Sequence, residues 1–348
     1  MDYYAGIDVS VKESSVCVVD GKGKVVKEAK VMSEPDALVA FLAGLRLPLT
    51  LVGLEAGPMS QWLHAGLQEA GIEVALMETR KVKAALSAMP VKTDRNDARG
   101  IAQLLRTGFF TEVHRKSDES QEVRALLTAR KLLVNSLIDV EMSIRGILRG
   151  FGLKVGPTTK PTFEGRIHNL AEDKPTLAAV VEPLLIARRA IREQLAVLNK
   201  RVRDIARQDG LCRRLMTAPG VGALTALNFK TGVDDPARFK SSRSVGAHFG
   251  LTPRRYQSGE TDIVGGITKA GDAAVRSALY EAALSIMTKV KKHSVLQAWG
   301  LAVAKRRGMK RAIVAVARKL GTILHRMWVD GTDFAWSRAD LEALAAAA

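Results

Sequence analysis

Two aspartates three positions apart, Asp94 and Asp97, are the residues best placed to hold a metal ion. They come directly before an apolar stretch that is typical of a helix, and residues at i and i+3 share one helical face. Two further acids, Asp8 and Glu55, each close a short apolar run. Carboxylate oxygens are ligands for hard cations such as Mg²⁺. The four acids therefore predict a cluster that binds Mg²⁺ together with a phosphate group.

The segments around these acids predict an α/β region at the start of the chain. Runs rich in β-branched residues indicate strands at 3–8, 14–19, 25–31, 50–54 and 73–77. The sequence Asp20-Gly21-Lys22-Gly23 predicts a hairpin between the second and third strands. Helices are expected after Ser33, which would be the N-cap, from about Ser60, and through 98–106.

The resulting order of elements, β-β-β-α-β-α-β-α, is that of the RNase H fold. In that fold, acids at the ends of the first and fourth strands and on a late helix meet at one metal site. The agreement concerns topology alone, so at this point it is an analogy.

The middle of the chain predicts a long helical hairpin. Residues 120–148 and 175–206 carry apolar side chains at helical spacing, and glycine and proline separate the two stretches. Two helices of this length with little between them favour an antiparallel pair of the coiled-coil kind. A dimerisation stalk and a connector packed on the catalytic domain both fit this pattern.

Positive charge is concentrated in the second half of the chain. The 348 residues include 53 Lys and Arg against 36 Asp and Glu, a net charge of +17 with a pI near 10.0. Residues 1–111 carry 13 basic and 13 acidic side chains, 112–208 carry 18 and 12, and 209–348 carry 22 and 11. We therefore expect three domains with these boundaries, of which the first is neutral. Nucleic acid is the expected partner, because Lys and Arg displace the counterions condensed on phosphates.

Several other classes of protein do not fit the sequence. Only two cysteines, Cys17 and Cys212, are present, without a CxxC pair, and the six histidines lack the spacing of metal ligands. The apolar stretches are too short for a membrane span, and the N-terminus runs into a predicted strand without a signal peptide. We therefore expect a soluble protein of a reducing compartment, with no membrane partner.

A Gly-Val-Gly turn in the basic region lies between short apolar helical stretches. Its residues Gly220 and Gly222 follow the pattern of a helix-hairpin-helix, in which backbone N–H groups approach a DNA phosphate. A simple turn between two helices has the same composition. Of the two interpretations, we favour phosphate contact.

Two further segments combine glycine with basic and hydroxyl side chains. Residues 249–260 form a predicted loop, which contains Arg254, Arg255, Tyr256 and Ser258. On its own, Ser258 would be a turn residue. Residues 265–272 contain Lys269 and lead into a helix with Arg276, and their glycine spacing differs from that of a P-loop.

A basic run at 305–311 precedes a predicted helix whose opposite face is apolar. A solvated basic face and a face that follows phosphates both fit this segment.

Six motifs occur in an order that resembles a known family. They are Gly6-Ile7-Asp8-Val9-Ser10, Leu54-Glu55-Ala56-Gly57, Lys92-Thr93-Asp94-Arg95-Asn96-Asp97-Ala98-Arg99, Pro219-Gly220-Val221-Gly222, Gly250-Leu251-Thr252-Pro253-Arg254-Arg255-Tyr256-Gln257-Ser258-Gly259 and Thr268-Lys269-Ala270-Gly271-Asp272. The chain resembles the insertion-sequence transposases with an Asp-Glu-Asp-Asp quartet, which are relatives of the pilin-gene invertases. One departure is Gly57-Pro58, where many members carry Thr-Gly.

The resemblance covers nearly the whole chain and implies its fold and chemistry. It implies an RNase H-like N-terminal domain of the resolvase type, a helical coiled-coil middle and a helical C-terminal transposase domain. It also implies that Asp8, Glu55, Asp94 and Asp97 hold Mg²⁺ and that Ser258 is the nucleophile. Arg254, Arg255, Tyr256, Lys269, Arg276, Gly220 and Gly222 would then contact nucleic acid.

The resemblance further implies the partners and setting of the protein. These are DNA at the element ends and at the target, a structured guide (bridge) RNA, and further copies of the chain in a dimer or tetramer. The expected compartment is the prokaryotic cytoplasm, with association to the nucleoid when the protein is bound to DNA.

Three rival hypotheses start from the same residues. A metal-dependent, resolvase-like DNA nuclease would use the four carboxylates without a serine adduct. An actin-like ATPase or sugar kinase also opens with Gly6-Ile7-Asp8, but the chain has no second Asp-x-Gly motif and that class does not explain the basic C-terminal region. A non-enzymatic nucleic-acid-binding protein would need a degenerate quartet, whereas all four acids are present.

Overall fold

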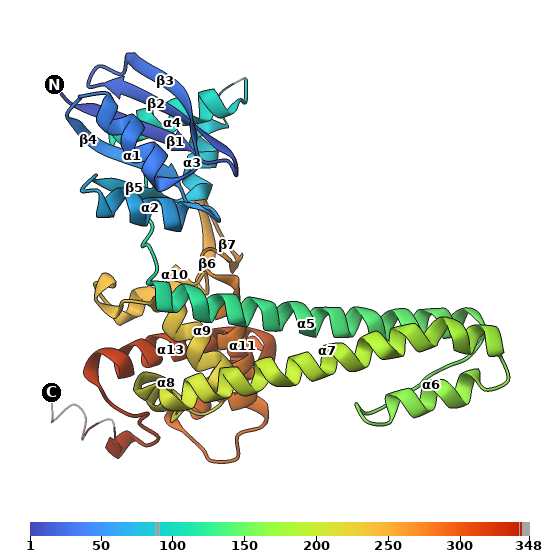
Figure 1. Cartoon of the computed structure of the whole chain (residues 1–348). Helices are drawn as coiled ribbons and strands as arrows, with labels where there is room; N and C mark the ends of the chain where they lie inside the picture. Colours follow the sequence, from blue (N-terminus) through green and yellow to red (C-terminus); the bar gives the residue numbers. More distant parts are fainter. Residues whose placement is uncertain (88, 90, 341, 343–348) are drawn as a thin grey trace. The chain divides into compact units, whose positions relative to one another are not determined.

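The computed structural model describes the chain except for residues 88, 90, 341 and 343–348. The chain divides into two compact units, Met1–Lys116 and Ser117–Ala348 (Figure 1). The predicted boundary at 208/209 falls within the second unit, and the division into three domains stays a prediction. Among the helices that the structure describes, none is both long enough and apolar enough to span a bilayer.

The first unit is built on a mixed sheet of five strands. They are β1 (Tyr3–Asp8), β2 (Glu13–Asp20), β3 (Val25–Met32), β4 (Leu49–Glu55) and β5 (Val74–Met77). The spatial order is β3-β2-β1-β4-β5, with antiparallel pairing from β3 to β1 and parallel pairing from β1 to β5. All five predicted strands are present, and this order with these directions is that of the RNase H fold.

Helices cover both faces of this sheet. They are α1 (Pro35–Gly44), α2 (Ser60–Glu69), α3 (Thr79–Leu86) and α4 (Asp94–Thr107). The leucines of α1 and α2 share one core with Ile7 and Leu54 of the sheet. On the other face, α4 packs Ala98 and Ala102 against Cys17.

One local prediction for this unit is wrong, and one of its helices was not predicted. Ser33 does not cap α1, because Glu34 occupies the N-cap position and no side chain bonds to the helix. The buried Ser33 hydroxyl instead donates to the Ser10 carbonyl oxygen at 2.6 Å, which fastens the end of β3 to the neighbouring segment. Helix α3 was not predicted, because Val82 is its only buried side chain and the apolar pattern is correspondingly weak.

Helix α4 lies directly on the backbone of β1 at Gly6. A Cβ atom at Gly6 would clash with the Ala98 carbonyl oxygen and the Ala102 nitrogen. Only glycine permits so close an approach, because any side chain would push the helix off the strand. The contact therefore fixes the distance of α4 from the centre of the sheet.

The second unit begins with the predicted helical pair. Its helices are α5 (Asp118–Gly150) and α7 (Pro175–Gln208), with the unpredicted short helix α6 (Phe163–Ala171) between them. At the far end of the pair, the guanidinium of the fully buried Arg188 donates to Glu141 and Glu164, each at 2.8 Å. It also lies over the Phe163 ring, with 4.6 Å to the centroid. One arginine thus ties α5, α6 and α7 together.

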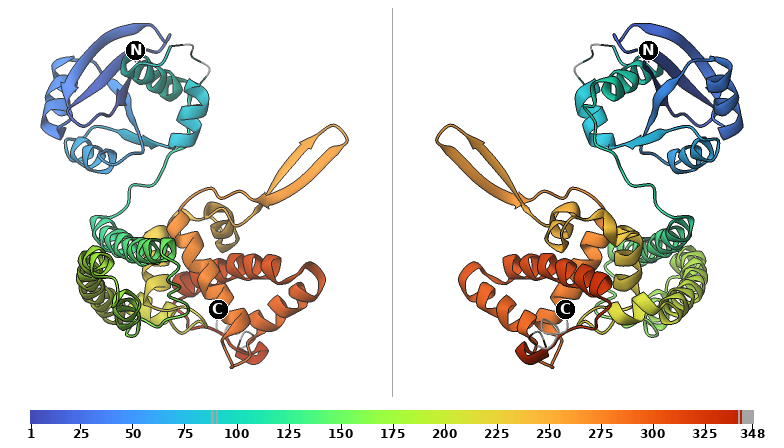
Figure 2. Two further views of the ribbon diagram at one scale, coloured as in Figure 1. Left: turned by 90° about the vertical axis from the view of Figure 1, so that its right-hand side faces the viewer. Right: turned by 90° about the vertical axis from the view of Figure 1, so that its left-hand side faces the viewer.

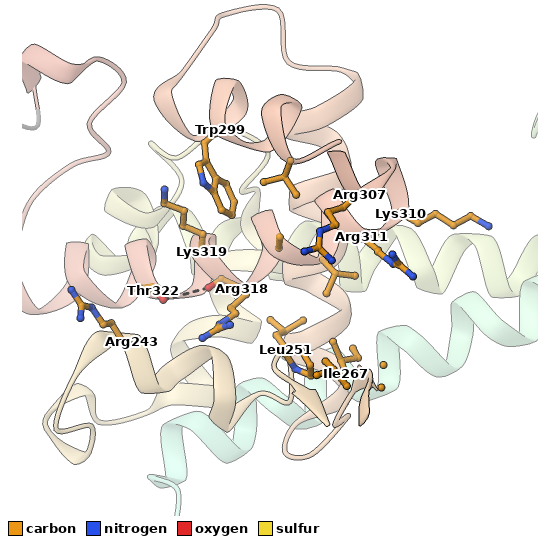
Figure 3. Close-up of a pocket in the computed structure, with 17 residues that line it drawn as sticks. Arg243, Leu251, Ile267, Trp299, Arg307, Lys310, Arg311, Arg318, Lys319 and Thr322 are labelled. Carbon is orange, nitrogen blue, oxygen red and sulfur yellow. Dashed lines mark hydrogen bonds between the residues drawn. The ribbon is translucent and has the colours of Figure 1, made fainter. Parts of the chain in front are cut away.

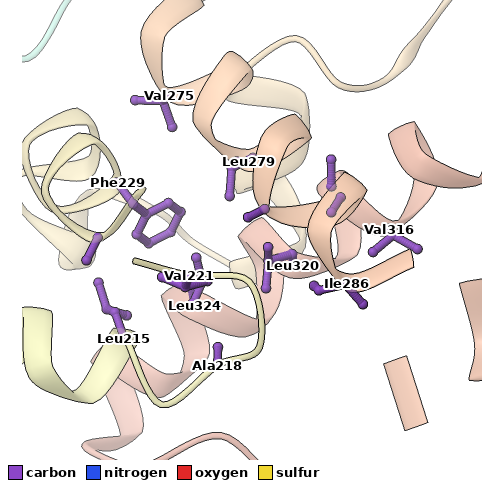
Figure 4. Packing of buried hydrophobic residues seen from close by; sticks show 14 of the residues in the cluster. Leu215, Ala218, Val221, Phe229, Val275, Leu279, Ile286, Val316, Leu320 and Leu324 are labelled. Carbon is purple, nitrogen blue, oxygen red and sulfur yellow. The ribbon is translucent and has the colours of Figure 1, made fainter. Parts of the chain in front are cut away.

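The rest of the second unit is a helical body with one exposed hairpin. Its helices are α8 (Gly210–Leu215), α9 (Ala223–Val233), η1 (Pro236–Arg238), η2 (Ser242–Ser244), α10 (Val245–His248), α11 (Ala273–Thr288), α12 (Val295–Arg307) and α13 (Met309–Asp330). Their largest shared core includes Phe229, Leu279 and Leu320 (Figure 4). The ends of α5 and α7 pack into the same core, through residues such as Val202. The two-stranded hairpin of β6 (Pro253–Ser258) and β7 (Thr261–Ile267) projects from this body (Figure 2).

We expect Gly6→Ala to lower the free energy of unfolding by about 3 kcal/mol or to prevent folding, because the methyl group enters the backbone of α4. Gly44→Ala is the matched control, since nothing lies within 4 Å of a Cβ atom built there. Urea denaturation followed by circular dichroism measures both. Equal stability of the two variants would show that α4 does not depend on this contact.

Candidate active site

The four predicted acids lie at one edge of the first unit. Asp8 ends β1 and Glu55 ends β4, and these strands are parallel neighbours with Ile7 opposite Leu54. Their carboxyl ends therefore reach the same edge of the sheet. Asp94 and Asp97 lie in the first turn of α4, where the helix dipole favours negative charge.

The acids influence one another electrostatically. The pKa of Asp8 is raised from 3.8 to about 6, mainly by burial and then by the negative charges of Asp97, Asp94 and Glu55, in that order. Burial also raises the pKa of Glu55, against a hydrogen bond with Thr79 that lowers it, and Asp97 adds to the rise. These shifts show that Asp8 and Glu55 lie within electrostatic range of Asp97. That the four acids bind a metal ion together stays a prediction.

Although the acids are coupled electrostatically, they do not have the spacing of metal ligands. Among the described residues, no group of three or more His, Cys, Asp or Glu side chains is close enough to hold a metal ion. Coulomb forces act over several ångströms, whereas a carboxylate ligand lies about 2.0–2.6 Å from its cation. The acids therefore lie within electrostatic range of one another but farther apart than the ligands of a bound metal ion. The all-oxygen donor set fits a hard divalent cation such as Mg²⁺.

Two salt bridges hold the first turn of α4 to strand β3. The Glu28 carboxylate of β3 accepts hydrogen bonds from Arg95 Nε at 2.7 Å and from Arg99 Nη2 at 2.8 Å. The bond from Arg95 is the main cause that lowers the pKa of Glu28. Because Arg95 and Arg99 flank Asp97 on the helix, this pairing fastens the segment that carries Asp97 to β3. Sequence reasoning missed Glu28, and the only signal was the i, i+4 spacing of the two arginines.

The structure places Ser258 at the end of a strand. Residues 249–260 were predicted as a loop, but half of them, Pro253–Ser258, form β6, and Gly265 and Gly266 belong to β7. Gly259, with φ +55°, makes the turn, and Ser258 pairs with Thr261 across it. The hairpin escaped prediction because nearly all of its residues are exposed, so no apolar alternation marks the strands.

The basic residues near Ser258 have different surroundings. Arg255 pairs with Asp262 across the hairpin through two hydrogen bonds of 2.8 Å, whereas Arg254 and Tyr256 are exposed on β6. Arg276 donates to the carbonyl oxygens of Phe249 and Ala270, so its guanidinium fastens the base of the hairpin.

The remaining predicted contacts lie farther along the chain. Lys269 adopts a left-handed backbone, with φ +55°, just before α11. Gly220 also has a positive φ of +72°, and a Cβ atom there would clash with the Ala282 carbonyl oxygen of α11. Its lack of a side chain is thus needed for packing within the protein. Gly222, in contrast, is exposed at the N-cap of α9, with open space around it.

The predicted catalytic residues therefore lie in two groups, one in each unit. The four acids lie together in the first unit, and Ser258 lies with Arg254, Arg255 and Tyr256 on the hairpin of the second unit.

Comparison with known proteins identifies the family. Residues 5–152 match the family DEDD_Tnp_IS110, described as a transposase, and residues 212–297 match the transposase IS116/IS110/IS902 family. The transposase for insertion sequence element IS1111A of Coxiella burnetii is 31% identical over 325 residues, 92% of this chain and 87% of that protein. The transposase for insertion sequence element IS1328 of Yersinia enterocolitica is 26% identical over 304 residues, 85% of this chain and 88% of that protein.

Among solved structures, Thermus thermophilus RuvC in complex with a Holliday junction substrate has a TM-score of 0.25 and 18% identity, and covers 32% of this chain and 100% of its own. The assignment rests on the sequence relatives, which span both units, and on the two family matches. The chain belongs to the IS116/IS110/IS902 family of transposases.

Proposed function

We propose that this protein cuts and rejoins DNA at the ends of an insertion sequence and at its target, through a covalent bond between Ser258 and a DNA phosphate. The four carboxylates Asp8, Glu55, Asp94 and Asp97 hold Mg²⁺ for this reaction. The observation that carries the proposal is the electrostatic coupling of the four acids, which adds to burial in raising the pKa of Asp8 to about 6. A bound cation would relieve this repulsion.

The covalent step is a transesterification. The Ser258 hydroxyl oxygen attacks the phosphorus of the scissile phosphodiester, a new P–O bond forms, and the P–O bond to the leaving nucleoside breaks. The serine proton leaves to solvent or a nearby base, and the departing oxygen takes up a proton. A hydroxyl of a second DNA strand reverses the step at the same phosphorus. The phosphodiester energy is conserved, so rejoining requires no ATP.

Residues of the chain position the reacting groups. The exposed end of β6 presents Ser258 to a strand of DNA, and Arg254, Arg255 and Lys269 hold the phosphate. Two of the five donors of Arg255 engage Asp262, which orients the guanidinium and leaves donors for a phosphate oxygen. Asp8, Glu55, Asp94 and Asp97 would hold Mg²⁺, and the bound ion would supply neutralisation of charge at the scissile phosphate.

The partners of the reaction follow from charge and from strand exchange. The region 209–348 carries 22 basic and 11 acidic side chains, which suits binding of DNA and of a structured guide RNA. Exchange of strands between two duplexes requires more than one active site, so the protein acts as a homo-oligomer, a dimer or tetramer. Its place of action is the cytoplasm, on the nucleoid.

A second candidate function uses the same four acids but forms no covalent bond between Ser258 and DNA. A metal-dependent nuclease of the resolvase kind would hydrolyse DNA with the quartet alone, and Ser258 would be a turn residue of the hairpin. The exposure of Ser258 at a hairpin end is compatible with both functions, so the covalent product separates them.

We expect Ser258→Ala to abolish strand cleavage and the covalent product while DNA binding is retained, because the variant lacks only the attacking oxygen. Thr261→Ala is the matched control, since it removes a second hydroxyl paired with Ser258 across the same turn. Labelled element-end DNA, Mg²⁺ and co-purified RNA are mixed with each protein and run on a denaturing gel. Cleaved DNA without a protein adduct in the wild type would favour the nuclease.

We expect Asp8→Asn to have opposite effects on stability with and without Mg²⁺. The folded-state pKa of Asp8, about 6, lies above its ordinary value of 3.8. Ionised Asp8 therefore destabilises the folded state above pH 6, and this destabilisation disappears as the pH falls towards 3.8. Near neutral pH in EDTA, the variant should gain about 1 kcal/mol, a value reduced for the half-exposed side chain. With Mg²⁺, the wild type should gain stability that the variant lacks.

The check is thermal unfolding of both proteins in EDTA and in Mg²⁺. Glu69→Gln removes the same charge from an exposed site on α2 and should change neither condition. A wild type that gains no stability from Mg²⁺, or an Asp8→Asn variant that gains as much, would contradict the ligand role of Asp8.

A further inference from the structure

A cleft of about 1170 Å³ opens in the second unit beside the base of the β6–β7 hairpin (Figure 3). Residues of α12, α13 and both hairpin strands line it. Six of the lining side chains are basic: Arg243, Arg307, Lys310, Arg311, Arg318 and Lys319. None of the lining residues is acidic.

The six cations lack the carboxylate partners that other arginines of the chain have. Among the described residues, none of the six forms an ion pair, whereas Arg99, Arg188 and Arg255 each do. All six are exposed, so their charges are available to a ligand. Like charges gathered in one cleft repel one another, and a polyanion would remove that repulsion.

The core of the unit forces these cations onto one surface. On α13, Val316 and Leu320 are buried in the core (Figure 4), as is Ile313. The basic residues Lys310, Arg311, Arg318 and Lys319 of the same helix are exposed. Lys310 and Arg311 lie about two turns before Arg318 and Lys319, which places both pairs on the same side of the helix.

The floor of the cleft is apolar and aromatic. Leu251, Ile267, Val303 and Val314 contribute to it. The half-buried ring of Trp299 also lines the cleft, and Lys319 Nζ lies 4.3 Å from its centroid. A duplex presents its phosphates outwards and keeps its bases stacked inside, so it would leave such a floor unused. A basic rim above an aromatic floor is the arrangement that binds single strands, because unpaired bases can stack while phosphates meet the cations.

We propose that this cleft binds single-stranded DNA that leads to the reacting phosphate. The inference rests on the proposed function, which makes DNA the substrate. Pro253, at the cleft, begins the strand that ends with Ser258, and five residues of strand span about 17 Å. A strand held in the cleft is thus a few nucleotides from Ser258. Phosphates bind the rim cations, and a base stacks on Trp299.

The test compares two triple variants in a Ser258→Ala background, which prevents cleavage of the probe. The cleft variant is Lys310→Gln, Arg311→Gln and Arg318→Gln. The control, Lys131→Gln, Lys200→Gln and Arg203→Gln, removes the same charge from exposed positions of α5 and α7. The probes are a labelled thymidine oligonucleotide, a duplex of the same length and a uridine oligonucleotide, each titrated over a range of salt.

We expect the cleft variant to bind the thymidine oligonucleotide about tenfold more weakly than the control variant, with duplex binding little changed. The slope of log affinity against log salt should fall by about 2, because three phosphate contacts are lost at about 0.7 each. Trp299→Leu, which keeps an apolar side chain but removes the aromatic ring, should weaken single-strand binding about fivefold without changing the slope. Circular dichroism confirms that each variant is folded.

Three results would overturn the inference. They are equal binding by the cleft and control variants, an equal loss for duplex and single strand, and a loss confined to the uridine probe. Because binding is measured without catalysis, these outcomes do not depend on whether Ser258 forms an adduct.

Discussion

Helix α4 rests on the backbone of β1, and this contact sets the position of Asp94 and Asp97 relative to the acids of the sheet. Gly6 leaves no room for a side chain between them, and the small Ala98 and Ala102 face it from the helix. Asp8 follows Gly6 by two residues on the strand, and Asp97 precedes Ala98 on the helix. A contact made for packing therefore also brings carboxylates of separate elements within electrostatic reach of each other.

The buried face of α4, which includes Ile101 and Leu105, sets the rotation of the helix as well as its distance from the sheet. The Glu28 carboxylate adds a polar contact, since it pairs with Arg95 and Arg99 from strand β3. Both arginines are substantially exposed, so the pairing contributes little to global stability. Its effect is local: it fastens the first turn of α4, which carries Asp94 and Asp97, to the sheet.

Much of this arrangement was predictable from the sequence, and the failures have physical causes. The five strands and the two long helices were predicted because apolar periodicity marks buried faces. The quartet was predicted because strand ends and helix starts can be located from such runs. The hairpin that carries Ser258 was not, since exposed strands lack this signal. Glu28 was missed because it is 67 residues from Arg95, and pairing at that separation depends on the register of the folded sheet.

The charged side chains of this chain are arranged in two ways. Arg188 and Lys230 are each paired with two carboxylates, so their charges are compensated within the protein. The acids around Asp8 and the cations of the cleft are different, because each set brings like charges together. Such a set gains free energy only from a partner of opposite sign. A phosphodiester suits the cations, and a divalent metal ion suits the acids. DNA that reacts in the presence of a metal ion supplies both, and a neutral substrate supplies neither.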